Sequence, residues 1–268
     1  MTDRGVLMPP ENEYYFGYYF YAPQGRFEPC GMFTAEHIIS SLICILIVIG
    51  LLVLLNKINC RNDLNQKIVR ISAVSLTVLE VIKITHSFIY SDLHLDAWFP
   101  LSYCGLFIYA LWMVGFGKGK VKRCGEVFIA YGCAFAGLMF LIFPTTSLML
   151  FPIWHYFSLY SLLFHSVMIF VGVRLLLEEN KFDKSTYLNY FIYVLLFAIV
   201  SIVMNFVFGC NLMNLREPYN IPIQILQDIY NAFSPAYTII GLIIYMLVPF
   251  LIAAVFGKFH TKNKEKSE

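Results

Sequence analysis

Seven stretches of about 20 mainly apolar residues follow one another along the chain, and a helix of that length crosses the hydrocarbon core of a bilayer. Short polar segments separate the stretches. The pattern predicts an all-α, polytopic membrane protein with seven transmembrane helices. The expected spans are residues 36–56, 68–90, 97–116, 124–143, 152–175, 187–209 and 235–257.

The loops between the predicted spans alternate in charge. Lys and Arg cluster after the first, third, fifth and seventh spans, whereas residues 91–96 and 144–151 contain neither. Basic loops stay on the cytoplasmic side of a membrane. The sequence therefore predicts a multi-pass protein of the cell membrane with its N-terminus outside and its C-terminus in the cytoplasm.

Composition supports the same class, because 59% of the residues are hydrophobic and only 13% are charged, far from the balance of a soluble domain. We expect an aromatic-rich outer segment at 1–35, a membrane domain at 36–257 and a basic cytoplasmic tail at 258–268. The aromatic run from Tyr14 to Tyr21 suits an interfacial belt, or alternatively a lid over an outward-facing site. The apolar stretch at 221–226 predicts a short interfacial helix.

The seven cysteines are scattered rather than paired in the spacing of a zinc site, so no metal is expected. Cys30 and Cys210 both fall outside and either form a disulfide or stay free, depending on the compartment. Nothing in the sequence indicates a cofactor or a nucleic-acid partner. The expected partners are membrane lipids, and the oligomeric state is left open.

Polar side chains inside the predicted spans are the candidates for function. An ionisable residue at the bilayer centre costs about 2.5–3.5 kcal/mol on insertion scales, so it usually has a role. Those found here lie between the outer surface and the midplane, apart chiefly from Glu126 near the cytoplasmic entry of the fourth span. The one-sided placement suggests a cavity open to the outside, or a layer that holds helices together. The candidate substrate-binding or cavity residues are His37, Glu80, Lys83, His86, Ser161, Asn205 and Asn211.

Glu80 and Lys83 are three residues apart on the second span, so we expect them to pair on one helix face.

Cys104 and His165 are the candidate catalytic residues, on the third and fifth spans. With Pro100 in the first turn of a continuous third helix, their depths are roughly 9 and 16 Å from the outer side. A thiol beside an imidazole is a nucleophile–base pair, although a lone intramembrane cysteine is also a small apolar side chain.

Six short motifs, in order along the chain, resemble those of the YwaF family of bacterial integral membrane proteins. They lie at Glu36–Ile38, Leu79–Val81, Phe99–Cys104, Glu126–Gly137, Phe164–Ser166 and Asn205–Met213. That family is similar to a eukaryotic multi-pass phospholipid acyltransferase thought to use a Cys and a His. The resemblance implies a lipid acyltransferase or lipid hydrolase with Cys104 as nucleophile and His165 as base. The alternatives are a small-molecule transporter or ligand-binding protein without catalysis, and a scaffold whose polar layer only holds helices together.

The topology leads to a direct test with single cysteines introduced into a cysteine-free background. Loops 56–67, 117–123 and 178–186 should be cytoplasmic, because they carry most of the Lys and Arg. An impermeant thiol reagent added to intact cells should therefore not label position 120, but should label it after the cells are opened. Labelling of position 120 from outside would contradict the predicted orientation.

Overall fold

The computed structural model describes residues 16–57, 62–90, 95–178, 183–219 and 223–265, and within these ranges all regular structure is helical. Short η elements interrupt or connect the α-helices: η1 is a single π-helical segment, and η2 and η3 are 3₁₀ turns. The order is α1 Phe16–Phe20, α2 Ala35–Lys57, α3 Asn62–Ile89, α4 Leu95–Trp98, α5 Leu106–Phe116, α6 Gly119–Phe128, η1 Ile129–Cys133, α7 Ala134–Ile142, η2 Ser147–Met149, α8 Tyr156–Glu178, α9 Lys184–Phe208, η3 Leu212–Asn214, α10 Gln224–Ala232 and α11 Ser234–Glu265.

Five segments of the described chain are long and apolar enough to cross a membrane. They are Ala35–Asn56, Gly119–Met149, Tyr156–Glu178, Lys184–Phe208 and Ser234–Val255. They correspond to the first, fourth, fifth, sixth and seventh predicted spans, so the prediction of an all-helical, multi-pass membrane protein is confirmed. The second predicted span lies within the 28-residue helix α3, which is not among the five, and the number seven stays a prediction.

The prediction of a continuous third helix over 97–116 is wrong. Helix α4 ends at Trp98 and α5 begins at Leu106, and the residues between them are not helical. Pro100 explains the break, because proline lacks an N–H and disfavours helical backbone at the residue before it. The 11 residues of α5 extend about 16 Å, roughly half of the hydrocarbon core.

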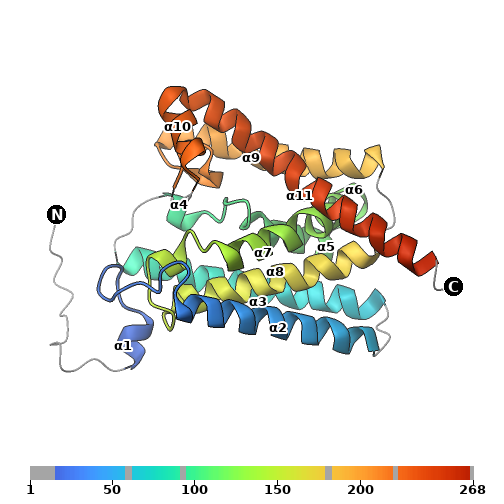
Figure 1. Cartoon of the computed structure of the whole chain (residues 1–268), viewed down its shortest axis with the longest axis horizontal. Coiled ribbons are helices and arrows are strands. Elements are labelled where there is room, and N and C mark those ends of the chain that lie inside the picture. The colour runs from blue at the N-terminus through green and yellow to red at the C-terminus, as the bar shows by residue number, and fades with distance from the viewer. Residues whose placement is uncertain (1–15, 58–61, 91–94, 179–182, 220–222, 266–268) are drawn as a thin grey trace.

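Helix α8 lies at the centre of the packing and contacts α2, α3, α7 and η1. Figure 1 shows the long helices lying side by side, with their axes broadly along the long dimension of the molecule. Close contact between α7 and α8 needs a small residue, since a Cβ on Gly137 would lie 2.8 Å from the carbonyl oxygen of His165. Small residues allow such close approach between membrane helices.

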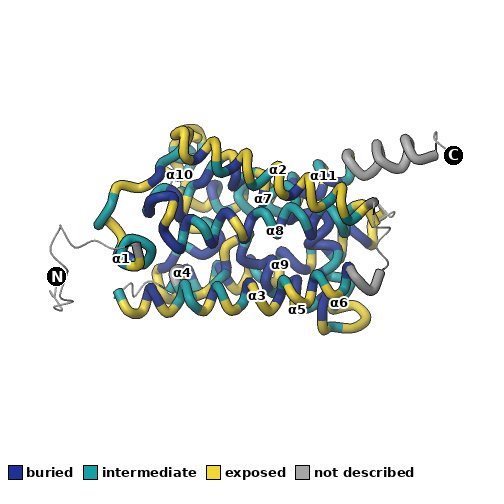
Figure 2. The backbone as a smooth tube through the Cα atoms, turned by 90° about the horizontal axis from the view of Figure 1, so that it is seen from below, coloured by how far each residue is buried: buried dark blue, intermediate teal, exposed yellow. Residues whose placement is uncertain are grey.

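The outer helices turn apolar side chains away from the protein. On α2, Ile39, Leu46 and Ile47 are each more than half exposed, and Figure 2 shows exposed residues along this helix while buried ones collect between helices. An exposed apolar surface of this kind is costly in water but suits the hydrocarbon of a bilayer. Helix α2 is therefore a peripheral, lipid-facing helix.

The N-terminal segment is docked on the ends of α3 and α8. The ring of Tyr21 stacks on Tyr156 with centroids 5.4 Å apart, and His86 Nε2 donates to the Tyr21 carbonyl at 3.1 Å. His155 Nε2 donates to the Ala22 carbonyl at 3.0 Å. These contacts hold residues 20–22, called the N-terminal strap below, against the helical bundle. Tyr14 and Tyr15 of the aromatic run lie outside the described residues.

The sixth loop contains the helix α10, close to the short interfacial helix expected at 221–226, of which 221–222 lie outside the described residues. No residue of α10 is buried. Ile225, Leu226 and Ile229 fall on one side of the helix and Asn231 on the other, by the 3.6-residue period. A short amphipathic helix with an unburied apolar side is typical of the membrane interface.

We therefore expect a fluorescent tryptophan at Ile225 to be quenched by lipids brominated in their acyl chains, after reconstitution into vesicles. The matched variant with tryptophan at Asn231 should be quenched several-fold less, because that side faces water. Equal quenching at the two positions would contradict an interfacial α10.

Candidate functional site

The non-helical segment Leu101–Gly105 carries Cys104, and its backbone finds partners inside the protein. Met213 N donates to Leu101 O at 3.1 Å, and Leu106 N donates to Ser102 O at 3.1 Å. Ser102 Oγ accepts from Gly105 N at 3.0 Å, within the turn itself. Because lipid offers no hydrogen bonds, irregular backbone at membrane depth is tolerated only where protein or water satisfies it.

A buried group of tyrosines surrounds this turn. Tyr103 and Tyr190 share a hydroxyl–hydroxyl hydrogen bond of 2.7 Å, and Tyr190 donates to the Tyr245 carbonyl at 2.7 Å. The Tyr103 hydroxyl fits against η1 only because residue 132 is glycine, where a Cβ would lie 2.6 Å from that oxygen. A π-helical segment such as η1 often accompanies a functional site.

Cys104 is a free, half-buried cysteine at the edge of the main apolar cluster. It lies near Cys133 and Tyr245. The correction of the third span also changes its setting: Cys104 lies in a turn before α5, and its depth therefore does not follow from the rise of a continuous helix.

His165 lies on α8 in a different neighbourhood. Its Nδ1 is 2.7 Å from the Ser161 carbonyl oxygen, and a carbonyl can only accept, so Nδ1 carries the proton and Nε2 has the lone pair. The ring stacks on Phe140 with centroids 3.6 Å apart. Among the described residues, no hydrogen bond joins His165 to Cys104, and their pairing stays a prediction.

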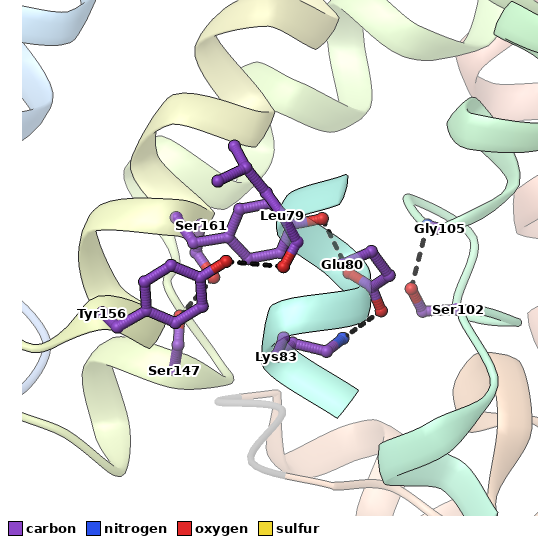
Figure 3. A network of polar contacts seen from close by, with 9 residues as sticks. Leu79, Glu80, Lys83, Ser102, Gly105, Ser147, Tyr156 and Ser161 are labelled. Carbon is purple, nitrogen blue, oxygen red and sulfur yellow. Dashed lines mark hydrogen bonds and ion pairs between the residues drawn. The ribbon is translucent and has the colours of Figure 1, made fainter. Parts of the chain in front are cut away.

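Glu80 and Lys83 form the expected pair on α3. The second carboxylate oxygen of Glu80 accepts from the Tyr160 hydroxyl at 2.6 Å, and the Tyr156 hydroxyl donates to the Leu79 carbonyl at 2.5 Å. Figure 3 shows this network between α3 and α8. The side chain of Glu80 is 7% exposed and that of Lys83 is 26% exposed, so the ammonium group lies on the more open side of the pair.

Three other candidates from the sequence are held by backbone partners. His37 accepts from Phe33 N at 3.0 Å and donates through Nε2 to the Leu141 carbonyl at 3.0 Å, which ties α2 to α7. Asn205 binds both the N–H and the carbonyl of Leu212, at 2.7 and 3.0 Å. Asn211 accepts from Arg216 N at 3.1 Å and donates to the Glu217 carbonyl at 2.9 Å.

The two remaining candidates, His86 and Ser161, lie on α3 and α8 near the end of the bundle where the N-terminal segment docks. His86 holds the N-terminal strap through Tyr21, as described above, and its ring is edge-on to His155 with centroids 5.6 Å apart. Ser161 Oγ accepts from Ser147 Oγ at 2.6 Å. Trp154 precedes α8 and is 60% exposed.

Sequence reasoning missed several polar residues that the fold uses. His155 is fully buried, and its position beside the first turn of α8 was the available signal. At the opposite end of α8, Arg174 donates to Asn65 at 2.8 Å and lies 3.8 Å from Glu178. This end of the helical bundle is thus more polar than the sequence indicated.

The disulfide left open between Cys30 and Cys210 is not formed, because both are free, buried thiols. They belong to different apolar clusters. Burial, with the charge of Glu36 as a smaller contribution, raises the pKa of the Cys30 thiol, against an opposing hydrogen bond with Thr34. The Cys30 thiol therefore stays protonated and weakly nucleophilic at neutral pH.

These features define a multi-pass helical membrane protein with an interrupted helix inside its membrane domain. The chain belongs to the TMEM164 family, whose pattern it matches over residues 32–259. No curated protein and no solved structure matches the chain. The match covers the whole membrane domain, and the resemblance to the YwaF family is not confirmed by it.

The buried pair on α3 leads to a stability test. Lys83→Met should lower the free energy of unfolding by about 3 kcal/mol, because it leaves the Glu80 charge buried without its partner. The double variant Lys83→Met with Glu80→Gln should lose less, since the introduced amide still accepts from Tyr160 and carries no charge. Unfolding in mild detergent measures both, and Lys120→Met, at an exposed position in the first turn of α6, serves as the control. Additive losses would show that the two side chains are not coupled.

Proposed function

We propose that this protein is a lipid acyltransferase or lipid hydrolase of the cell membrane, with Cys104 as nucleophile and His165 as base. The observation that carries the proposal is the turn Leu101–Gly105, a non-helical segment that presents a cysteine inside a helical membrane domain. Such a turn requires partners for every backbone group. A segment retained at that cost is a better candidate for chemistry than for packing alone.

The tautomer of His165 supports its part in the proposal. With Nδ1 donating to Ser161 O, Nε2 is left as a proton acceptor in a fixed ring. This is the arrangement in which a second hydrogen bond orients a general base. The neighbouring ring of Phe140 further restricts rotation of the imidazole.

The proposed reaction has two balanced steps. Cys104 Sγ transfers its proton to His165 Nε2 and attacks the acyl carbonyl of a lipid ester, so that a C–S bond forms and the ester C–O bond breaks. The imidazolium returns the proton to the departing alkoxide. In the second step the oxygen of a lipid hydroxyl, or of water in a hydrolase, attacks the thioester carbonyl, so that a C–O bond forms and the C–S bond breaks. The hydroxyl proton passes through His165 Nε2 to the leaving thiolate, which restores the Cys104 thiol.

A base must come within about 2.6–3.2 Å of the group that it deprotonates, directly or through one water. Since no described contact joins Cys104 to His165, the proposal includes one water that carries the proton between them while the Leu101–Gly105 turn stays in place. We also propose that the site opens toward the outer leaflet, with the N-terminus outside, on the basis of the loop charges.

The alternative is a transporter or ligand-binding protein with an outward-facing polar cavity. Such a site needs polar groups that are free to meet a ligand. The contacts of His37, Asn205 and Asn211 instead use these side chains within the protein, which favours the enzymatic proposal. Lys83 is the candidate that remains most open to a ligand, because only part of its side chain is covered.

Acyl exchange with labelled phospholipid in vesicles tests the proposal. Cys104→Ala and His165→Ala should each lower the exchange rate at least a hundredfold, because nucleophile and base act as one unit. Cys44→Ala changes a cysteine of α2 outside the proposed site and should leave the rate within about twofold. An activated acyl probe should trap a thioester on Cys104, which mass spectrometry locates. This thioester should be absent from both Cys104→Ala and His165→Ala, because each variant blocks the first step. Unchanged exchange in folded Cys104→Ala protein would falsify the proposal.

A further inference from the structure

The loop that follows α9 adopts backbone conformations that side chains normally avoid. Met213 has φ +55° and Asn214 has φ +50°, in the left-handed region where residues other than glycine are disfavoured. Two consecutive residues of this kind persist only where surrounding contacts fix them, and they concentrate at functional sites. Contacts from the surrounding residues must therefore hold this loop in place.

Asn205 holds the loop from the last turns of α9. Its side chain is 6% exposed, and it binds the N–H of Leu212 at 2.7 Å and the carbonyl of the same residue at 3.0 Å. It also accepts from Cys210 Sγ at 3.4 Å. A primary amide is the side chain that offers a donor and an acceptor to one residue in this way.

The loop in turn holds the segment that bears Cys104. The next residue after Leu212, Met213, donates its N–H to Leu101 O at 3.1 Å. Its carbonyl accepts from the Tyr245 hydroxyl at 2.9 Å, and the ring of Tyr245 stacks on Tyr103 with centroids 4.8 Å apart. The loop thus fixes the turn at Leu101. Tyr245 fixes the turn at Tyr103 and also holds the loop at Met213.

We infer that Asn205 is a positioning residue for Cys104, acting through Leu212, Met213 and the Leu101 carbonyl. The inference rests on the proposed role of Cys104 as nucleophile. It replaces the expectation that Asn205 contacts a ligand: its amide orients the loop, and the loop orients the turn. Without the amide, the left-handed backbone relaxes, Met213 N leaves Leu101 O, and Cys104 becomes mobile.

The experiment measures the alkylation rate of each cysteine in the full-length protein, in vesicles, by mass spectrometry with a small maleimide. Asn205→Ala should raise the rate at Cys104 at least tenfold relative to Cys133, which is fully buried and serves as the internal reference. The pH dependence of the Cys104 rate should also change, whereas a change in general stability alone would affect all cysteines alike.

Two hydroxyl deletions on α11 form the matched pair. Tyr245→Phe removes the donor to Met213 O, and Thr238→Val removes the donor to Leu215 O at 2.7 Å. Tyr245→Phe should raise the Cys104 rate several-fold, and Thr238→Val should leave it within about twofold. If Asn205→Ala accelerates alkylation of all cysteines together, the Tyr245→Phe variant tests the inference instead. An unchanged alkylation rate at Cys104 in Tyr245→Phe overturns the inference.

Reactivity of the thiol is independent of acyl transfer, so the two proposals fail separately. Loss of the Asn205 effect on alkylation with exchange activity intact would remove the positioning role alone. A clear Asn205 effect on alkylation in a protein whose Cys104→Ala variant still exchanges acyl chains would keep the positioning role and remove the catalytic one.

Discussion

The absence of hydrogen-bonding solvent in a bilayer is the constraint on which this structure depends. A helix satisfies its own backbone, but the turn Leu101–Gly105 does not, and each of its polar groups must be met by the protein. One such partner comes from a distant part of the chain: Met213, in the loop after α9, donates its N–H to Leu101 O at 3.1 Å. Tyr193 of α9 donates to Leu106 O at 2.7 Å, at the start of α5 directly after the turn.

The same constraint explains the buried polar residues within the helical bundle. His37, Glu80 and Asn205 are each largely buried, and each has a specific partner on another helix or loop. Burying a polar group without a hydrogen-bond partner costs more free energy than a single surface contact contributes. Their role in holding the helices is compatible with a role in chemistry, because a nucleophile in a membrane domain must itself be held by a rigid frame.

The sequence was sufficient for the class of fold, because long apolar stretches and basic loops follow directly from the physics of the bilayer. The Glu80–Lys83 pair was also predictable, since helical spacing alone brings the two side chains together. The break before α5 was not: Pro100 is tolerated in a first helical turn as readily as in a turn that ends a helix. The choice depends on Met213 and Tyr193, which are about a hundred residues away in the sequence and therefore invisible to local patterns.

The strap at residues 20–22 has a consequence for how the protein is assembled in the membrane. Ala22 is bound by His155, so the N-terminal segment and the start of α8 lie at the same end of the helical bundle. The chain between them must cross the bundle an even number of times. During synthesis, Ala22 emerges long before its partner does, and its carbonyl has no histidine to meet until the segment leading into α8 has been delivered to that side. The N-terminal strap can therefore dock only after the helices before α8 have been inserted so that residue 22 and the start of α8 lie at the same end of the bundle.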